Sequence, residues 1–212
     1  MRWLTEAPVL EPIGFIQPCL PTNSREVPSR SQWAYEIKHD GFRFSCRRDG
    51  DRVRVFSRRG NDYTDRVPLI AEALAALRVK SVTIDGEGVV CRADAVADFD
   101  RLRAAVGRLG SRDAFLYAFD LLEINGDDLR RYEWQVRRAT LKSLLRKARD
   151  GIRLSEHLDA DDGDAVYRQA CAMGLEGIVA KRRDSRYRSG RCADWIKVKN
   201  PDAPAAIRVI EG

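Results

Sequence analysis

Short β-type runs and helical patterns follow one another irregularly along the 212 residues, and this order constrains the fold more than any other feature. Three β-type runs precede the first helical pattern, and Asp49-Gly50 between the second and third predicts a hairpin. A further turn is expected at Gly86, between two later runs. Because a regular βαβ rhythm is missing, the order favours an α+β fold with mainly antiparallel sheets. Strands are expected at 33–37, 42–48, 52–57, 82–85, 88–91, 115–122, 177–181 and 195–199, and helices at 68–77, 98–109, 133–149 and 163–173.

The composition is that of a globular chain, with 44% hydrophobic and 33% charged residues. At this length one domain with subdomains is the default. No apolar run approaches the roughly 20 residues of a membrane span, and Glu6, Pro8, Glu11 and Pro12 interrupt any signal peptide. Five widely spaced cysteines and two histidines do not suggest a disulfide framework or a zinc site. We therefore expect a cytoplasmic protein without membrane association.

Lysine is scarce in this basic chain, and its distribution is informative. Basic residues exceed acidic ones by six, which favours a polyanionic partner. Only seven of the 38 basic residues are lysines, and four of these lie in two short segments at opposite ends of the chain: Lys38, Lys181, Lys197 and Lys199. An amine can lose its proton and attack an electrophile, whereas a guanidinium stays charged. The clustering is therefore a first indication of lysine chemistry.

Several short segments carry chemistry-bearing residues, and each one alone also has an ordinary structural interpretation. Lys38 follows an apolar strand and precedes a tight Asp-Gly turn, which places it at a strand end facing a cleft, or makes it a solvent-facing lysine before a hairpin. Asp85-Gly86-Glu87 is either a functional motif or a common turn. Lys197 and Lys199 point to the same face of a strand. An anion between them would relieve their repulsion, unless they guard a solvated edge strand.

Taken in order, the segments resemble the nucleotidyltransferase motifs of the ATP-dependent DNA ligases, within a superfamily that also includes RNA ligases and capping enzymes. The matching motifs are K-x-D-G at 38–41, S-R-x-G at 57–60, D-G-E at 85–87, the Phe119-Asp120 pair, E-G-[IV]-V-x-K at 176–181 and W-x-K-x-K at 195–199. Segments 33–38 and 58–64 are most similar to the ligase module of bacterial end-joining ligases. The resemblance implies a nucleotidyltransferase (ATP-grasp-like) fold, with helices flanking the sheets around a central nucleotide cleft.

The resemblance also implies a reaction. Lys38 would attack the α-phosphate of ATP to form a lysine–AMP phosphoramidate, and AMP would then pass to a DNA 5′-phosphate for strand joining. An ordinary lysine amine is almost always protonated, and nearby cations would favour its neutral form. Glu36 would lie beside the adenine, Phe119 would stack on it, and Mg²⁺ or Mn²⁺ would suit the oxygen ligands. The implied nucleotide-binding residues are Glu36, Ile37, Arg43, Arg58, Glu87, Phe119, Lys181, Lys197 and Lys199, and the implied metal ligands are Glu87 and Glu176.

The expected domain organisation is an extended, proline-rich N-terminal arm at 1–30, an adenylation domain at 31–200 and a short tail at 201–212. The family carries an oligonucleotide-binding domain after the last lysine motif, and the 13 residues that follow Lys199 are too few to form one. We therefore expect a fragment or a stand-alone adenylation domain. Two alternatives stay open, a non-catalytic module that binds nucleotides or DNA ends, and an RNA ligase. The intact Lys38, Glu87 and Glu176 favour the enzyme.

Arginines gather between Lys181 and Lys199, with only Asp184 and Asp194 opposing them. We expect these arginines to form a loop beside the active site that contacts DNA phosphates, and a solvated loop between two strands is the alternative. The predicted DNA-binding residues are Arg182, Arg183, Arg186, Arg188 and Arg191. The expected partners are nicked or broken DNA and a separate DNA-binding or end-joining protein, with the chain acting as a monomer at the bacterial nucleoid.

Overall fold

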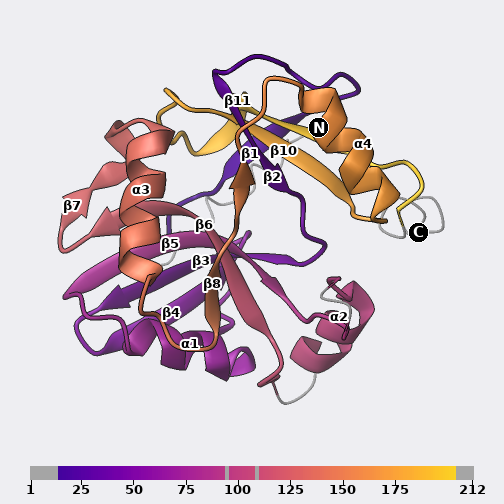
Figure 1. Ribbon diagram of the computed structural model, residues 1–212. Coiled ribbons are helices and arrows are strands. Elements are labelled where there is room, and N and C mark those ends of the chain that lie inside the picture. Colours follow the sequence, from indigo (N-terminus) through magenta and orange to yellow (C-terminus); the bar gives the residue numbers. More distant parts are fainter. Residues whose placement is uncertain (1–13, 94–95, 108–109, 204–212) are drawn as a thin grey trace, which may run out of the picture.

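Two β-sheets and four α-helices make up the part of the chain that the computed structural model describes, which is residues 14–93, 96–107 and 110–203 (Figure 1). Most strand pairs are antiparallel. The parallel pairs are β1 (Cys19–Ser24) with β11 (Gly190–Lys199), and β6 (Phe115–Ile124) with β8 (Ile152–Leu154). The α+β class with mainly antiparallel sheets, predicted from the order of elements, is confirmed. Among the described residues no helix combines the length and apolar composition needed to cross a membrane.

The first sheet has the strand order β1-β11-β10-β2-β9. Its remaining strands are β2 (Trp33–Ile37), β9 (His157–Leu158) and β10 (Gly177–Arg182). Helix α4 (Gly163–Ala172) packs on this sheet through an apolar cluster that includes Tyr35 and Ile178. The helix begins after Asp162, whose carboxylate accepts the backbone N–H of Ala165 and so satisfies one of the free donors of the first turn.

The second sheet has the strand order β4-β3-β5-β6-β7, with β8 pairing to β6. Its remaining strands are β3 (Phe42–Asp49), β4 (Arg52–Ser57), β5 (Ser81–Val89) and β7 (Asp127–Asp128). The predicted hairpin joins β3 to β4, and Gly50 turns there with φ +58°. The other helical segments are α1 (Pro68–Ala75), α2 (Phe99–Gly107), α3 (Trp134–Leu145), and the 3₁₀ turns η1 (Thr64–Arg66) and η2 (Leu129–Arg131). The largest apolar core lies between this sheet, α1 and α3.

The expected turn at Gly86 is wrong, because β5 runs without interruption through this residue. A Cβ at Gly86 would lie 2.8 Å from both the Leu116 side chain and the Tyr117 carbonyl oxygen. The pairing of β5 with β6 shifts register between Asp85 and Gly86. Glycine is needed here for the close approach of two strands, and that requirement has the same local signature as a turn.

Other differences lie at element ends and in short strands. Strand β1 forms within the proline-rich segment for which only an extended arm was expected. The three short strands β7, β8 and β9 were not predicted, and β11 begins at Gly190 rather than at Trp195. Helix α3 ends at Leu145, four residues before the predicted end. The last two residues of the predicted helix 98–109 lie outside the described residues, as do 1–13 of the expected arm and 204–212 of the expected tail.

Candidate active site

A cleft of about 730 Å³ lies between the two sheets. The first sheet contributes residues of β1, β2, β10 and β11 to its walls, and the second contributes residues of β3, β5, β6 and the turn that follows β4. Nine of the predicted site residues line this cleft: Glu36, Ile37, Lys38, Arg43, Arg58, Glu87, Phe119, Lys181 and Lys197. Residues from six separate motifs are therefore brought together, although the chain distance between the first and last exceeds 150 residues.

Lys38 lies at the end of β2, where the chain leaves the first sheet and crosses to β3 of the second. Its backbone N–H donates to the carbonyl oxygen of Gly177 (2.9 Å), and its ammonium forms an ion pair with Glu176. The following turn packs tightly on β5, because a Cβ at Gly41 would lie 2.3 Å from the Gly88 carbonyl oxygen. The Lys38 side chain lines the cleft and is partly exposed to solvent.

Two carboxylates share the surroundings of Lys38. Burial raises the pKa of Glu87 to about 7. The nearby positive charges of Lys38 and Arg43 oppose this rise, whereas the negative charge of Glu176 adds to the rise. Burial also lowers the pKa of Lys197, and the positive charge of Lys38 lowers it further. The arrangement concentrates ionisable groups of both signs around one amine, as sites of phosphoryl-type transfer require.

Glu87 and Glu176 suit the metal ion that the resemblance implies. The described residues hold no group of three or more acidic, histidine or cysteine side chains that would enclose a metal completely. Two carboxylates that face one amine fit a Mg²⁺ or Mn²⁺ ion that takes its other ligands from substrate phosphate and water. A divalent cation there would also offset the repulsion from Glu176, which adds to the rise in the pKa of Glu87 that burial causes.

At the other end of the cleft, Lys181 is buried between two aromatic rings. Its Nζ lies 4.3 Å from the ring centroid of Phe119 and 4.2 Å from that of Trp195. The same ammonium donates a hydrogen bond of 2.8 Å to Oε2 of Glu36. Oε1 of Glu36 is buried and has no hydrogen-bond partner among the described residues. A buried acceptor without a hydrogen bond destabilises the fold, and the amino group of a purine base is a donor that would satisfy this oxygen.

Sequence reasoning missed several residues of the site. Arg138 of α3 donates through Nε to Nδ1 of His157 (3.3 Å), and its charge and that of Lys181 oppose the rise in the pKa of Glu36 that burial causes. His157 pairs with Glu36 in the register of β2 and β9. Nothing in the local sequence marks an arginine in the middle of a helix as part of a distant site. Trp195 is the first residue of the W-x-K-x-K motif, and its place in that motif is the signal that could have identified it as a site residue.

His39, which was not assigned a role, stacks on Tyr117 with ring centroids 4.1 Å apart and planes 8° from parallel. Burial and the adjacent charge of Lys38 lower the pKa of His39 to about 4. The ring is therefore neutral at physiological pH. Leu20 and Pro21 of β1 also line the cleft, and their strand was hidden by the prolines around it.

Arg43 is held by a buried network beneath the cleft. Its Nε and Nη2 donate to the two oxygens of Asp85, at 2.9 and 2.6 Å. Its guanidinium carbon lies 5.1 Å from the ring centroid of Phe119 and 5.9 Å from that of Trp195. Although burial alone would lower the pKa of Arg43, the ion pair with Asp85 raises it, so the charge is retained.

Two predicted site residues, Glu176 and Lys199, do not line the cleft itself. Glu176 precedes β10 and reaches the cleft through its ion pair with Lys38. Lys199 pairs with Gly177 at the same end of the sheet, and its side chain is exposed. Both lie beside the position of Lys38, because the backbone of Gly177 bonds to Lys38.

The loop between β10 and β11 is shorter than predicted, because Arg182 is the last residue of β10 and Arg191 the second residue of β11. The five arginines divide into two groups. Arg182 forms ion pairs with Asp184 (2.7 Å) and Asp194 (3.4 Å), and Arg183 pairs with Asp159. Three other arginines are exposed, namely Arg186, Arg188 and Arg191. Arg186 and Arg188 join Arg130 and Arg131 of η2 around a surface depression of about 310 Å³.

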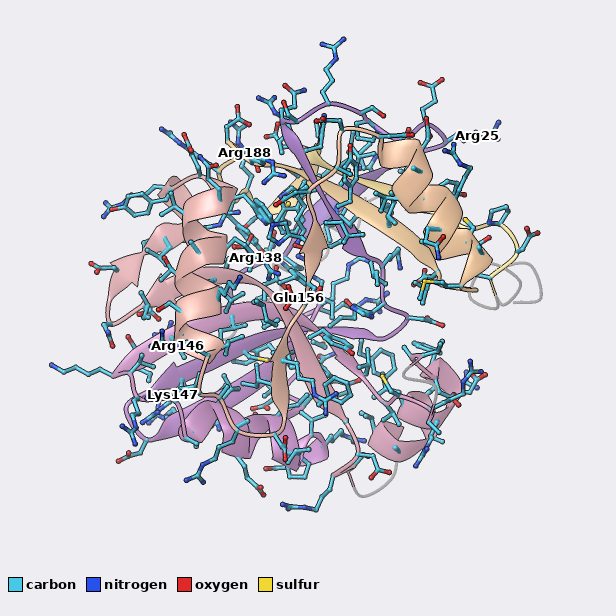
Figure 2. The ribbon with its side chains drawn as sticks, in the orientation of Figure 1. Arg25, Arg138, Arg146, Lys147, Glu156 and Arg188 are labelled. Atoms are coloured by element: carbon cyan, nitrogen blue, oxygen red, sulfur yellow. The ribbon has the colours of Figure 1, made fainter. Side chains whose placement is uncertain are left out.

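The loop lies at the end of the first sheet that is remote from Lys38. Arg182 pairs with Trp33 at the start of β2, whereas Lys38 follows its last residue. Five residues of strand separate the two positions by roughly 16 Å. Figure 2 shows Arg188 near the start of α3, with Arg146 and Lys147 past the other end of that helix.

The sequence profile of the ATP dependent DNA ligase domain matches residues 22–199, so the chain belongs to the ATP-dependent DNA ligase domain family. Over 175 residues it is 40% identical to the multifunctional non-homologous end joining protein LigD of Pseudomonas aeruginosa, an alignment that covers 82% of this chain and 21% of LigD. It is 32% identical over 197 residues to a probable DNA ligase of Sorangium cellulosum, covering 87% of this chain and 37% of that protein.

Solved structures agree with this assignment. The mycobacterial DNA ligase D complexed with ATP and MES superposes with a TM-score of 0.73 at 36% identity, covering 86% of this chain and 59% of that one. The ligase domain of Mycobacterium tuberculosis LigD gives the same TM-score and identity, covering 60% of that chain. The chain spans about a fifth of the length of the LigD relatives. The nucleotidyltransferase fold expected from the motifs is thereby confirmed.

Proposed function

We propose that this chain is the adenylation domain of an ATP-dependent DNA ligase, which forms a covalent AMP adduct on Lys38 and passes AMP to a DNA 5′-phosphate. The observation that carries the proposal is that Lys38 lines the same cleft as Glu36, whose buried Oε1 has no hydrogen-bond partner among the described residues. An adenine amino group at Glu36 and an α-phosphate at Lys38 fit a nucleotide spanning the cleft. Phe119 would pack on the base, and Arg43 and Arg58 would contact the ribose and the phosphates.

In the proposed reaction the Lys38 amine attacks the α-phosphorus of ATP. The nitrogen–phosphorus bond forms, and the bond from the α-phosphorus to the pyrophosphate oxygen breaks with its electron pair going to pyrophosphate. Lys38 must first release a proton, and the Glu176 carboxylate in contact with its ammonium is placed to accept it. Lys197 and Arg58 supply positive charge beside the departing phosphates.

Glu87 and Glu176 would hold Mg²⁺ or Mn²⁺, which when bound supplies positive charge to the phosphate oxygens. The role of Lys199 would be a longer-range one, because its exposed ammonium lies beside the triphosphate end of the cleft rather than in its wall. The adenylation domain expected at 31–200 is proposed to include β1 as well, because this strand pairs with β11 and contributes Leu20 and Pro21 to the cleft.

The proposed nucleic acid is nicked or broken DNA, and the biological setting is DNA repair by end joining in the bacterial nucleoid. The exposed Arg186, Arg188 and Arg191 support this proposal, because they are available to phosphate oxygens. Arg182 and Arg183 would contact DNA only by exchanging their acidic partners. We propose that the chain acts as a monomer alongside a separate DNA-end-binding protein.

The test is mass spectrometry of the intact protein after incubation with ATP and Mg²⁺. Wild type is expected to gain the mass of one AMP, Lys38→Met none, and Lys142→Met, an exposed lysine on α3, the same amount as wild type. Adduct formation by Lys38→Met would refute the assignment of the nucleophile. ATP binding without any adduct would favour the non-catalytic binding module, and sealing of nicked RNA in preference to DNA would favour an RNA ligase.

A further inference from the structure

Tyr187 is a buried residue in the loop from β10 to β11, and both of its neighbours along the chain are exposed arginines. Arg186 and Arg188 are exposed on either side of it, whereas the Tyr187 ring packs edge-on to Trp195 with centroids 5.9 Å apart. A loop residue with this environment is placed by the interior of the protein rather than by solvent. Its hydroxyl therefore has to find partners inside the fold.

The hydroxyl of Tyr187 makes two buried hydrogen bonds, one to each sheet. It donates to Oδ2 of Asp85 on β5 (2.6 Å) and accepts the backbone N–H of Cys19 on β1 (2.9 Å). Burial raises the pKa of Tyr187, and the carboxylate of Asp85 raises it further, so the hydroxyl keeps its proton and remains a donor. One oxygen atom thus joins the first sheet to the second.

Each partner of this hydroxyl is next to a wall of the proposed nucleotide cleft, although neither one lines it. Asp85 holds the guanidinium of Arg43 through two hydrogen bonds, and Arg43 lines the cleft. Cys19 directly precedes Leu20 and Pro21, which line the opposite side. Loss of the hydroxyl would leave the buried N–H of Cys19 without this acceptor. It would also remove one of the two donors to Oδ2 of Asp85, the other being Nη2 of Arg43, so the two walls would lose the atom that connects them.

We propose that Tyr187 is a positioning residue for the adenylation reaction, whose hydroxyl ties β1 to the Arg43–Asp85 pair and thereby sets the place of Arg43 beside the nucleotide. This inference rests on the proposed function, since it assumes that the cleft takes ATP. Tyr187 does not line the cleft, and it acts through Arg43 and the β1 wall. Tyr187 would strengthen the binding of ATP and of the transition state equally, because it holds the two walls in place before any bond forms or breaks.

The backbone of the loop is held independently of this hydroxyl. The Tyr187 N–H donates to the carbonyl oxygen of Arg130 (3.0 Å), and the carbonyl oxygen of Ser185 accepts the N–H of Trp134 (2.8 Å). Removing only the hydroxyl should leave Arg186 and Arg188 where they are. Contacts between the loop and DNA phosphates should therefore survive in a variant that lacks it.

The experiment compares Tyr187→Phe with wild type and with Tyr132→Phe, which changes an exposed tyrosine directly after η2. For Tyr187→Phe we expect the KM for ATP in adduct formation to rise about tenfold, the scale of one hydrogen bond to a charged group, with kcat within about threefold of wild type. The salt dependence of nicked-DNA binding should not change. Tyr132→Phe should match wild type in both measurements.

Two outcomes would overturn the inference: a KM within twofold of wild type, or a fall in kcat with KM unchanged. Calorimetric titration with ATP and thermal unfolding of the unliganded protein distinguish loss of positioning from loss of folding. Weaker ATP binding by a protein that is folded at the assay temperature supports the inference. If wild type forms no AMP adduct, the proposed function fails, and ATP affinity alone decides the role of Tyr187, with equal affinity for both proteins overturning it.

Discussion

Two lysine–glutamate pairs connect the same two strands of the first sheet, and they differ in exposure and in surroundings. Glu36 on β2 pairs with Lys181 on β10, while Lys38 just after β2 pairs with Glu176 just before β10. The side chains of Lys181 and Glu36 are 2% and 3% exposed, whereas those of Lys38 and Glu176 are 22% and 9% exposed. The antiparallel register thus places one enclosed pair and one accessible pair at the two ends of the cleft.

The comparison teaches that the same two residue types suit different proposed roles according to their access to solvent. Lys181 is confined by Phe119, Trp195 and Glu36, and it has little freedom to reach a phosphorus atom. Its charge compensates a buried carboxylate and leaves the second oxygen of that carboxylate for a ligand. Lys38 is held by its backbone and by one ion pair, so its amine can move toward a substrate. Confinement suits recognition, and partial exposure suits reaction.

Replacing the lysine of each pair by methionine should separate the two roles most strongly. Lys181→Met should lower the free energy of unfolding by about 3–5 kcal/mol, because it leaves the Glu36 carboxylate buried without its partner. Lys38→Met should change it by about 1 kcal/mol or less, because that pair is reached by solvent. Urea unfolding at pH 7 measures both. Equal losses in the two variants would show that the pairs are energetically alike.

Removing both charges of the enclosed pair should recover part of that loss. In Glu36→Gln/Lys181→Met neither charge remains to be desolvated, so we expect the double variant to be about 2 kcal/mol more stable than Lys181→Met alone. The same urea titration, completed with Glu36→Gln, gives the coupling free energy. Strictly additive effects would contradict a direct interaction between Glu36 and Lys181 in solution.

The exposed arginines of the loop that follows Lys181 and β10 test the proposed contact with DNA. Arg186→Ala/Arg188→Ala should make the slope of log K against log salt for nicked-duplex binding about 1.8 less steep, because each phosphate contact contributes about −0.9. AMP adduct formation on Lys38 should remain near wild type. The matched control is Arg146→Ala/Lys147→Ala, which removes two exposed charges past the other end of α3 (Figure 2). Parallel slopes for both double variants would make the loop an ordinary solvated surface.

The smallest expected effect concerns Glu87, at the Lys38 end. Its pKa is about 7 in the folded protein against an ordinary value of 4.5, so folding takes up a proton between these pH values and stability falls as pH rises through this window. Glu87→Gln, without nucleotide and with EDTA, should be about 1 kcal/mol more stable than wild type at pH 8, or roughly 2–4 °C in Tm. At pH 4.5 the two proteins should unfold at nearly the same temperature. If Glu87→Gln and wild type had the same Tm at pH 8 as well as at pH 4.5, the raised pKa of Glu87 would be contradicted.

Local sequence signals predicted most elements of the fold. Asp49-Gly50 produced the hairpin that joins β3 and β4, and Pro68 opens α1 at its first position. Strand β2 has the bounds that its apolar run indicated. These features depend on neighbours along the chain, since a turn, a helix start and a short apolar run are each specified within a few residues. Element ends were less accurate, as at α3, because packing decides where a helix stops.

Long-range pairing accounts for what the sequence did not reveal. Strand β1 was missed because its prolines oppose strand formation, and its partner β11 lies about 170 residues away. Gly86 was read as a turn because a glycine that lets two strands approach has the same local signature. Arg138 and Tyr187 carried no signal at all, since an arginine within a helix and a tyrosine within a loop acquire their roles only from groups on other elements.

The sequence by itself determined which groups we propose for reaction and binding, because the motifs around Lys38, Glu87, Glu176 and Lys181 name residue types whose chemistry does not depend on the fold. The tertiary structure decided which groups are enclosed and which are accessible. It buried Lys181 between two rings and left Lys38 partly exposed, and it joined the two walls of the cleft through one tyrosine hydroxyl. Burial and distance between remote segments follow from the packing of two sheets, and residue spacing along the chain does not encode them.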